Sequence, residues 1–419
     1  MRPHKKVSAV GWFVFVAIAS TFVVFLVTRS FGLHTLKQIA LRILAKPTHF
    51  LPVPNAQLGV RPNPNDPDHD SHGFRNAVFP KQADIVAMGD SQTYGVGCKR
   101  EEAWPQQLSR TAKTTTYNLS YSSYGPTHYY ILLDEALSLR PRIIVEALYY
   151  GNDFYDSYRH IYDLEQLPQF RSRKTPILQA IQKAEMTLPL SKQIALLFGA
   201  YIGRFPPAKH KLAVNEHPVP VNSCSSSDAV EPSAIEDNST LRKWKQLTQQ
   251  AQNSQGLWLL LDKPFLRTVF VPQYRYTAVN LNDSRIQEGI RISHEAIRLA
   301  AAQARKANTK FMVLLIPTKE LAYNKLMVTT QCRSDNGYAQ LIQKENAIRQ
   351  STKDFLQQSH IDFVDALPNL QLSMEQRHRV YPLTSDGHPV GSGQKVIAET
   401  VFSAIKERHW LENHLEIQK

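Results

Sequence analysis

The fold is decided by residues 84–95, which read DIVAMGDSQTYG. In this stretch an apolar run ends abruptly at Gly89, and two small polar residues, Asp90 and Ser91, follow it. The pattern predicts a buried strand that leads into a tight turn, with Ser91 at the carboxyl end of the strand. Open α/β sheets carry their chemistry at this edge, so Ser91 is a candidate nucleophile. A serine that only caps the next helix is the alternative, and the tripeptide alone does not choose between the two.

Apolar runs and helical patterns alternate on both sides of this stretch. Four further strands are predicted, over residues 115–119, 142–150, 309–317 and 361–364. Helices are predicted over residues 101–111, 284–307, 345–358 and 393–408. In the first of these helices, Trp104 and Leu108 are expected to face inward. The alternation predicts an α/β fold built on a parallel sheet with right-handed crossovers.

Residues 156–280 interrupt this alternation. They hold a candidate amphipathic helix pair over 176–205, a Ser-, Pro- and Asn-rich patch over 218–240, a helix over 241–253 and a Tyr- and Val-rich stretch over 269–279. We interpret them as an insertion of helical and irregular structure over the sheet edge. The main domain then consists of residues 81–155 and 281–410, and residues 411–419 form a tail.

The charge of the chain is unevenly distributed. Its 419 residues carry a net charge of +13, and residues 1–50 hold seven of the basic residues and no acid. Because the rest of the chain is only mildly basic, the composition does not indicate a nucleic-acid partner. A basic end beside an apolar segment indicates a membrane instead.

Residues 7–28 contain no charged residue and are long enough to span a bilayer as one helix. Trp12 lies near one end, where interfacial aromatic residues are common. A cleavable signal peptide is the alternative, but the apolar run continues through Val27, which favours an uncleaved anchor. Basic residues flank both ends, so the positive-inside rule alone does not orient the segment. Since short basic tails usually stay in the cytoplasm, we expect residues 1–30 to be a tail and inner-membrane anchor, with a periplasmic catalytic domain.

Residues 31–80 are expected to connect the anchor to the domain. Leu33 to Ala45 has a helical period, which fits either a basic amphipathic helix on the membrane or a juxtamembrane helix packed on the domain. Five prolines between Pro52 and Pro67 predict an extended linker.

The chain has three cysteines and no CxxC pair, so the sequence indicates neither a zinc nor an iron–sulfur site. In an exported chain, Cys224 and Cys332 are candidates for one disulfide, and two unpaired loop thiols are the equal alternative. Cys98 is left over and is not expected to be a nucleophile.

A nucleophilic serine needs a base, and the base needs an orienting group. Asp386 and His388 are two residues apart, so the carboxylate can reach Nδ1 of the same imidazole and leave Nε2 for a serine. Asn152 follows the strand predicted over 142–150, and its side-chain amide is a candidate oxyanion donor. Each motif alone also fits an ordinary turn. Together they are expected at one sheet edge, because each follows a strand or opens a helix.

The three motifs Gly89-Asp90-Ser91, Gly151-Asn152-Asp153 and Asp386-Gly387-His388-Pro389 resemble, in this order, three of the four blocks of the SGNH (GDSL) hydrolase superfamily. The resemblance covers residues 70–155 and 285–408. It implies a flavodoxin-like sheet of about five parallel strands and a catalytic triad of Ser91, His388 and Asp386. It also implies an oxyanion hole made by the Ser91 backbone, a glycine of the second block and the Asn152 side chain.

The second block departs from the pattern of that superfamily. Residues 118–125 read NLSYSSYG, and the expected glycine falls on Ser123, with Gly125 two residues later. A backbone N–H donates whatever the side chain, so Ser123 and Gly125 are both candidates for the oxyanion hole. A Cβ on residue 123 is expected to narrow the pocket or shift the loop.

Two further features of the sequence are candidates for substrate binding. Four aromatic residues flank Asn152 and fit either a sugar-stacking wall or core packing; they are Tyr149, Tyr150, Phe154 and Tyr155. The stretch 316–320, IPTKE, resembles the equivalent stretch of envelope-anchored superfamily members that act on exopolysaccharides, which makes Lys319 a candidate substrate contact.

Together with the predicted anchor, the resemblance implies a membrane-anchored esterase that acts on acyl esters at the cell envelope, and this chemistry requires no metal or organic cofactor. An O-acetyltransferase that modifies a cell-surface polysaccharide with the same residues is one alternative, and other polysaccharide-modifying envelope proteins are then candidate partners. A non-catalytic polysaccharide-binding assembly protein on the same scaffold is the second alternative.

Overall fold

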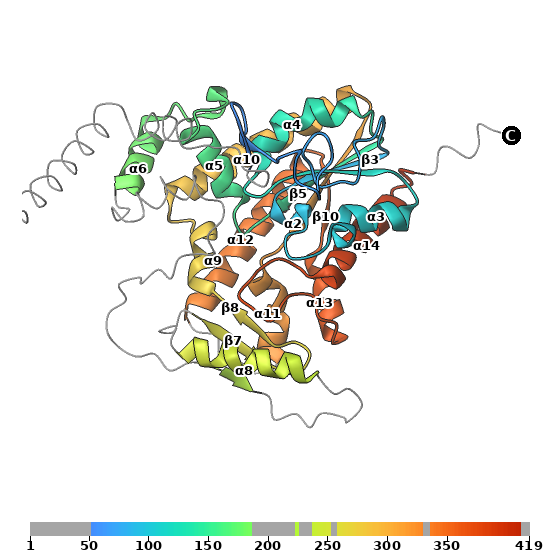
Figure 1. Ribbon diagram of the computed structural model, residues 1–419. Helices are drawn as coiled ribbons and strands as arrows, with labels where there is room; N and C mark the ends of the chain where they lie inside the picture. Colours follow the sequence, from blue (N-terminus) through green and yellow to red (C-terminus); the bar gives the residue numbers. More distant parts are fainter. Residues whose placement is uncertain (1–51, 187–222, 226–236, 253–257, 330–335, 412–419) are drawn as a thin grey trace, which may run out of the picture. The chain divides into compact units, whose positions relative to one another are not determined.

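A computed structural model describes residues 52–186, 223–225, 237–252, 258–329 and 336–411 (Figure 1). The expected membrane anchor, the helix expected over Leu33 to Ala45, and Cys332 lie outside these ranges. No helix within the described ranges is long and apolar enough to span a bilayer.

The core of the fold is a sheet of five parallel strands in the order β10-β9-β5-β3-β4. The strands are β3 Ile85–Gly89, β4 Thr116–Ser120, β5 Ile143–Tyr149, β9 Lys310–Ile316 and β10 Asp362–Asp365. All residues of β3, β4 and β5 are buried, which explains why β3 reads as an unbroken apolar run and β5 as an apolar run interrupted only by Glu146. The predicted α/β fold with about five parallel strands is confirmed.

Helices cover both faces of this sheet (Figure 1). Side chains of β3 alternate between two apolar cores, with Ile85 and Ala87 in one and Val86 and Met88 in the other. The first core is covered by α3 Trp104–Ala112, α11 Lys319–Thr329, α13 Leu367–Glu375 and α14 Gly391–Glu407. The second is covered by α4 Pro126–Ser138 and α10 Ser284–Lys306, and α12 Asn336–Gln358 contributes to both. Trp104 and Leu108 are fully buried, as predicted.

The proline-rich stretch differs from the expected extended linker. Two short strands, β1 Val53–Asn55 and β2 Gly59–Arg61, pair as an antiparallel hairpin. Asn55 Oδ1 accepts the backbone N–H of Leu58 at 2.9 Å, which closes the turn. Phe74, further along, is fully buried in the second core. The stretch therefore packs on the domain, because it carries apolar side chains that the domain buries.

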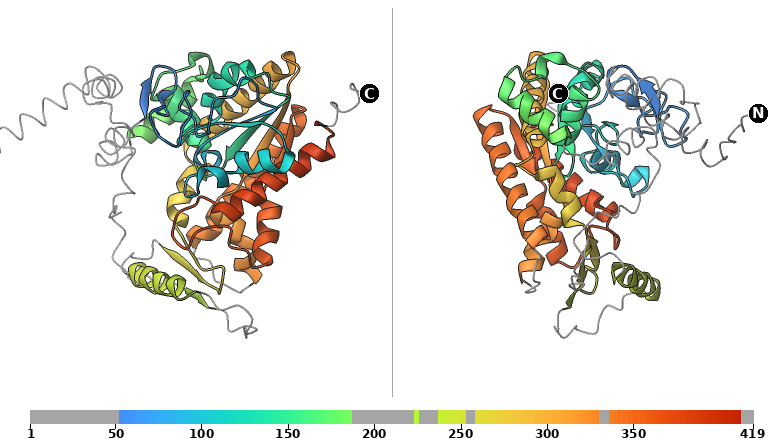
Figure 2. Two further views of the ribbon diagram at one scale, coloured as in Figure 1. Left: turned by 45° about the vertical axis from the view of Figure 1, so that its right-hand side comes forward. Right: turned by 90° about the vertical axis from the view of Figure 1, so that its left-hand side faces the viewer.

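The interrupted region contains more regular structure than expected. Its elements are α5 Asp153–Tyr162, α6 Thr175–Met186, β6 Ser223–Ser225, α8 Asn238–Gln252, β7 Leu259–Asp262, β8 Thr268–Phe270 and α9 Pro272–Val279. The three strands form a second sheet in the order β6-β7-β8, and α8 lies alongside β7 (Figure 2). The Val269 N–H donates to the Leu383 carbonyl at 3.1 Å, so this sheet is joined to the segment that leads to Asp386.

Candidate active site

Ser91 lies where β3 passes into the short helix α2 Ser91–Tyr94. The cap of this helix is Asp90, whose carboxylate accepts the Gln92 N–H at 2.9 Å. A Cβ on Gly89 would lie 2.0 Å from Thr93 Oγ1, so only glycine lets the helix approach the strand this closely. Because Asp90 serves as the cap, the Ser91 hydroxyl is left for other partners.

The structure brings Ser91, His388 and Asp386 together. His388 Nε2 is 2.9 Å from Ser91 Oγ, and His388 Nδ1 is 2.5 Å from Asp386 Oδ1. Asp386 Oδ1 also accepts the backbone N–H of His388 at 3.0 Å. Burial alone would raise the pKa of Asp386, but the hydrogen bonds and charge of His388 lower it below its ordinary value. The carboxylate is therefore ionised at neutral pH and fixes the imidazole with Nε2 toward the serine.

Lys319 supports the turn that carries these two residues. Its side chain is 1% exposed, and Nζ donates to the carbonyl oxygens of Thr384 at 2.6 Å and Asp386 at 3.2 Å. Burial lowers the pKa of Lys319 to about 7. This position, behind the turn, does not fit the substrate contact that the IPTKE stretch suggested.

The neighbours of Lys319 fix two further segments. The backbone N–H of Thr318 donates to Glu345 Oε1 of α12 at 2.8 Å. Glu320 Oε1 accepts the backbone N–H of Val271, just before α9, at 3.1 Å. Three consecutive buried residues thus join α12, the Asp386 turn and the inserted segment.

Asn152 ends the turn after β5 and is the N-cap residue of α5, but its side chain makes no capping hydrogen bond. Its Nδ2 donates to Asp156 Oδ2 at 2.6 Å, one helical turn further on. Burial raises the pKa of Asp156 to about 7, against the opposing effects of Arg159 and of this hydrogen bond. Burial also raises the pKa of Asp90, and hydrogen bonding from Asn152 partly offsets that shift. The Asn152 amide therefore lies close to the turn that carries Ser91.

The loop after β4 lies beside the Ser91 turn, because the Tyr121 N–H donates to the Gly89 carbonyl at 3.2 Å. Ser123 is exposed, and its φ of 64° lies in a region that favours glycine. This backbone conformation explains why the family pattern has a glycine at this position. Its N–H donates to no residue that the structure describes. The N–H of Gly125 is bound to His128 Nδ1 at 3.1 Å, so Gly125 does not fit the predicted oxyanion donor.

The aromatic residues around Asn152 mainly serve core packing. Tyr150 and Phe154 are fully buried, Tyr149 is 2% exposed, and only Tyr155 is partly exposed. They do not form an open wall for a sugar ring.

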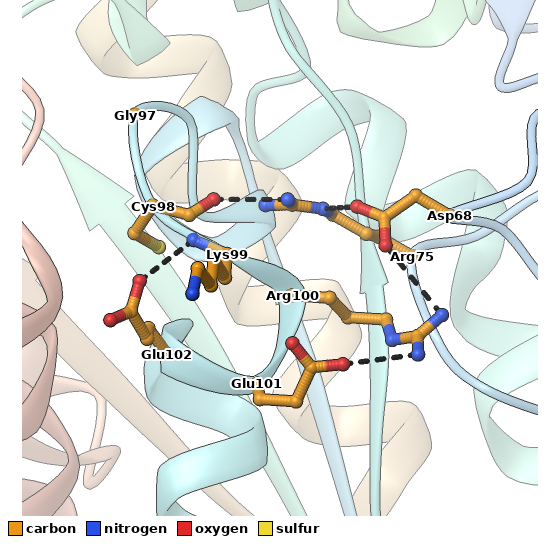
Figure 3. A pocket seen from close by; sticks show the side chains of 8 residues that line it. All are labelled: Asp68, Arg75, Gly97, Cys98, Lys99, Arg100, Glu101 and Glu102. Carbon is orange, nitrogen blue, oxygen red and sulfur yellow. Dashed lines mark hydrogen bonds and ion pairs between the residues drawn. The ribbon is translucent and has the colours of Figure 1, made fainter.

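A pocket of about 530 Å³ lies along the loop of residues 97–102 (Figure 3). It is lined by Asp68, Arg75, Gly97, Cys98, Lys99, Arg100, Glu101 and Glu102. A Cβ on Gly97 would lie 3.7 Å from Asp386 Oδ2, so this loop runs past the carboxylate. Arg75 pairs with Asp68 at 2.5 Å and donates to the Cys98 carbonyl at 3.0 Å, which holds the loop in place. Burial raises the pKa of the Cys98 thiol to about 11, so it is not a nucleophile at neutral pH.

Sequence patterns did not reveal two residues next to this site. Arg275 lies on α9, inside a Tyr- and Val-rich stretch that gave no functional signal, and its guanidinium lies against Gly387. Asp156 holds the amide of Asn152. An acid one helical turn after Asn152 was the only signal available for it.

Comparisons with known proteins return structural likeness only. No family model and no curated protein matches the chain. The solved structures that are similar in fold include an extracellular lipase from Streptomyces rimosus, with 10% identity, a TM-score of 0.36, and coverage of 77% of this chain and 98% of that chain. A mutant of an acetyl-xylooligosaccharide esterase from Geobacillus has 8% identity, a TM-score of 0.35, and coverage of 77% and 93%. A GDSL-like lipase from Bacteroides thetaiotaomicron has 9% identity, a TM-score of 0.31, and coverage of 77% and 88%. At these values the likeness carries no conclusion about activity.

Proposed function

We propose that this chain is a serine-dependent hydrolase of acyl esters, with Ser91 as its nucleophile. The observation that carries the proposal is the unbroken hydrogen-bonded series from Ser91 Oγ through His388 to Asp386, at 2.9 Å and 2.5 Å. The ordered motifs that resemble the SGNH superfamily support the same assignment.

In this mechanism, Ser91 Oγ attacks the ester carbonyl carbon while His388 Nε2 takes the hydroxyl proton. His388 returns that proton to the alcohol oxygen, so the alcohol leaves and an acyl-serine remains. Water then attacks the acyl-serine with His388 again as base, which releases the acid and restores Ser91. Asp386 holds the Nδ1–H and stabilises the imidazolium formed in each half.

The negative charge on the carbonyl oxygen needs donors close to Ser91. The Asn152 amide carries two hydrogens; Asp156 accepts one, and the oxyanion would compete with Asp90 for the other. The backbone N–H groups of Ser91 and Ser123 are the further candidates. Gly125 is not among them, because His128 occupies its N–H.

Replacement of the nucleophile tests the proposal. We expect Ser91→Ala to lower hydrolysis of 4-nitrophenyl acetate by about 10³-fold or more, with unchanged circular dichroism and melting temperature. Equal turnover by the folded variant would contradict the assignment of Ser91. The membrane anchor, the periplasmic location, a polysaccharide substrate and the transferase alternative stay predictions of the sequence.

A further inference from the structure

Arg275 places a guanidinium group beside the Asp386–His388 turn without a hydrogen-bond partner. A Cβ on Gly387 would lie 2.4 Å from Arg275 Nη2, so the guanidinium lies against the backbone between Asp386 and His388. Its Nε is buried and unpaired, and the guanidinium forms no hydrogen bond or ion pair with the part of the chain that the structure describes. By contrast, Arg285 and Arg349 pair with carboxylates.

Tyr149 provides a second, independent unpaired donor at the same place. Its side chain is 2% exposed, and its hydroxyl bonds to none of the described residues. The hydroxyl lies 3.5 Å from the position of a Cβ on Gly387 and 2.4 Å from that of a Cβ on Gly151. Gly387 precedes His388 and Gly151 precedes Asn152, so the two donors lie between the turns that carry the reacting groups.

The groups around Arg275 leave its donors uncommitted. Glu320 and Asp386 raise the pKa of Arg275 but do not bond to it, since Glu320 Oε1 accepts from Val271 and Asp386 engages His388; Glu320 Oε2 is unpaired among the described residues. Lys319 is bound to backbone carbonyls. Burial alone would lower the pKa of Arg275, but Tyr149 and Glu320 raise it above its ordinary value, so the charge is permanent. Arg275 is partly exposed as a residue, but its Nε is buried and unpaired, which is costly, and a ligand oxygen would remove that cost.

We propose that Arg275 and Tyr149 form a subsite that binds a carboxylate carried by the substrate next to its ester group. This inference deepens the proposed function and rests on it. A guanidinium fork matches the two oxygens of a carboxylate, and the Tyr149 hydroxyl adds a third donor. A neutral hydroxyl offers a single uncharged oxygen, so it matches the two-pronged guanidinium less well than a carboxylate does. The substrate class is therefore an ester that also bears a free carboxylate, such as the monoester of a dicarboxylic acid or a uronic acid acylated on a hydroxyl group.

Binding measured without turnover tests the subsite. In the Ser91→Ala protein, calorimetry should detect succinate and show at least tenfold weaker binding of the neutral succinamide. Adding Arg275→Gln should weaken succinate binding about tenfold or more, and adding Tyr149→Phe, which removes only the hydroxyl, should weaken it less. Arg298→Gln, an exposed arginine paired with Glu295, is the matched control and should leave binding unchanged. Equal binding of succinate and succinamide, no binding of succinate, or unchanged binding in the folded Arg275→Gln protein would each overturn the proposal.

Turnover separates this inference from the proposed function. With Ser91 intact, we expect the ratio of kcat/KM for mono-4-nitrophenyl succinate over 4-nitrophenyl acetate to fall about tenfold or more in Arg275→Gln. An unchanged ratio overturns the subsite while the hydrolase proposal stands. If the intact protein turns over neither ester, the hydrolase proposal fails, and the succinate measurement still decides the subsite.

Discussion

The Ser91 hydroxyl has two acceptors within reach, His388 Nε2 at 2.9 Å and Asp90 Oδ2 at 3.1 Å. Only the bond to His388 leads to proton transfer from the serine. Burial raises the pKa of Asp90, against the opposing effect of the hydrogen bond from the Gln92 N–H. The bond to His388 is the shorter of the two, and Asp386 orients the imidazole for it.

The role of Asn152 can be tested at the level of a single side chain. We expect Asn152→Ala to lower kcat for 4-nitrophenyl acetate by about 10²- to 10³-fold with little change in KM, because an oxyanion donor acts mainly in the transition state. Steady-state kinetics of the purified variant measure this. A rise in KM at unchanged kcat would instead assign Asn152 to ground-state binding.

Ser123 supplies a second prediction at this scale. Its φ of 64° costs a serine free energy that a glycine does not lose. We therefore expect Ser123→Gly to raise the free energy of unfolding by about 0.5–1 kcal/mol and to retain ester turnover, since the backbone N–H is kept. Urea unfolding and the same ester assay check both parts. A loss of stability would show that the serine side chain makes a contact that outweighs the strain.

Among the elements, the junction of β3 and α2 allows the least change. A Cβ on Gly89 would lie 2.0 Å from Thr93 Oγ1 and 3.2 Å from the Ala147 Cβ. We expect Gly89→Ala to destabilise the protein by about 2 kcal/mol, because the short helix must move away from the strand. Chemical denaturation measures the loss of stability. Gly97→Ala is the comparison, because a Cβ there would meet nothing closer than 3.7 Å and only the φ of 85° disfavours alanine.

Prediction from sequence worked best where one element carries its own signal. The strand at Ile85 is buried on both faces, and an unbroken apolar run is what such a strand requires. Arg275 carried no such signal, and the IPTKE stretch singled out Lys319 for a different role, because the importance of both residues depends on which distant segment they meet. Arg275 meets Gly387, and Lys319 meets the carbonyls of Thr384 and Asp386. The strands of the second sheet are three or four residues long, too short for a period to appear.

Across the whole molecule, the strand order brings the carboxyl ends of β3, β4, β5 and β9 to one edge. Ser91 follows β3, the Ser123 loop follows β4, Asn152 follows β5 and Lys319 follows β9. A doubly wound parallel sheet places ligands at such an edge. The motifs were predicted to converge for this reason, and the geometry of Ser91, His388 and Asp386 agrees.

Global stability should depend on Glu146, which lies 1% exposed inside β5 with Oε1 unpaired among the described residues. Burial raises its pKa to about 8. The folded protein therefore favours the protonated form of Glu146. The contribution of Glu146 to stability is complete below the pKa that it has in the unfolded chain and is lost as the pH rises toward 8. We expect Glu146→Gln to stabilise the protein by about 1–3 kcal/mol more at pH 8 than at pH 5, measured by urea unfolding at both values. An equal effect at the two values would show that Glu146 does not titrate in this range.

The central claim is that Ser91 is a nucleophile activated by His388. Treatment of the protein with a fluorophosphonate, followed by peptide mass spectrometry, tests it most directly, because the reagent reacts much faster with an activated serine than with an ordinary one. We predict one phosphonylated peptide, modified at Ser91, and strongly reduced labelling in His388→Ala. Labelling of a different serine, or none at Ser91 in the folded protein, would contradict the claim.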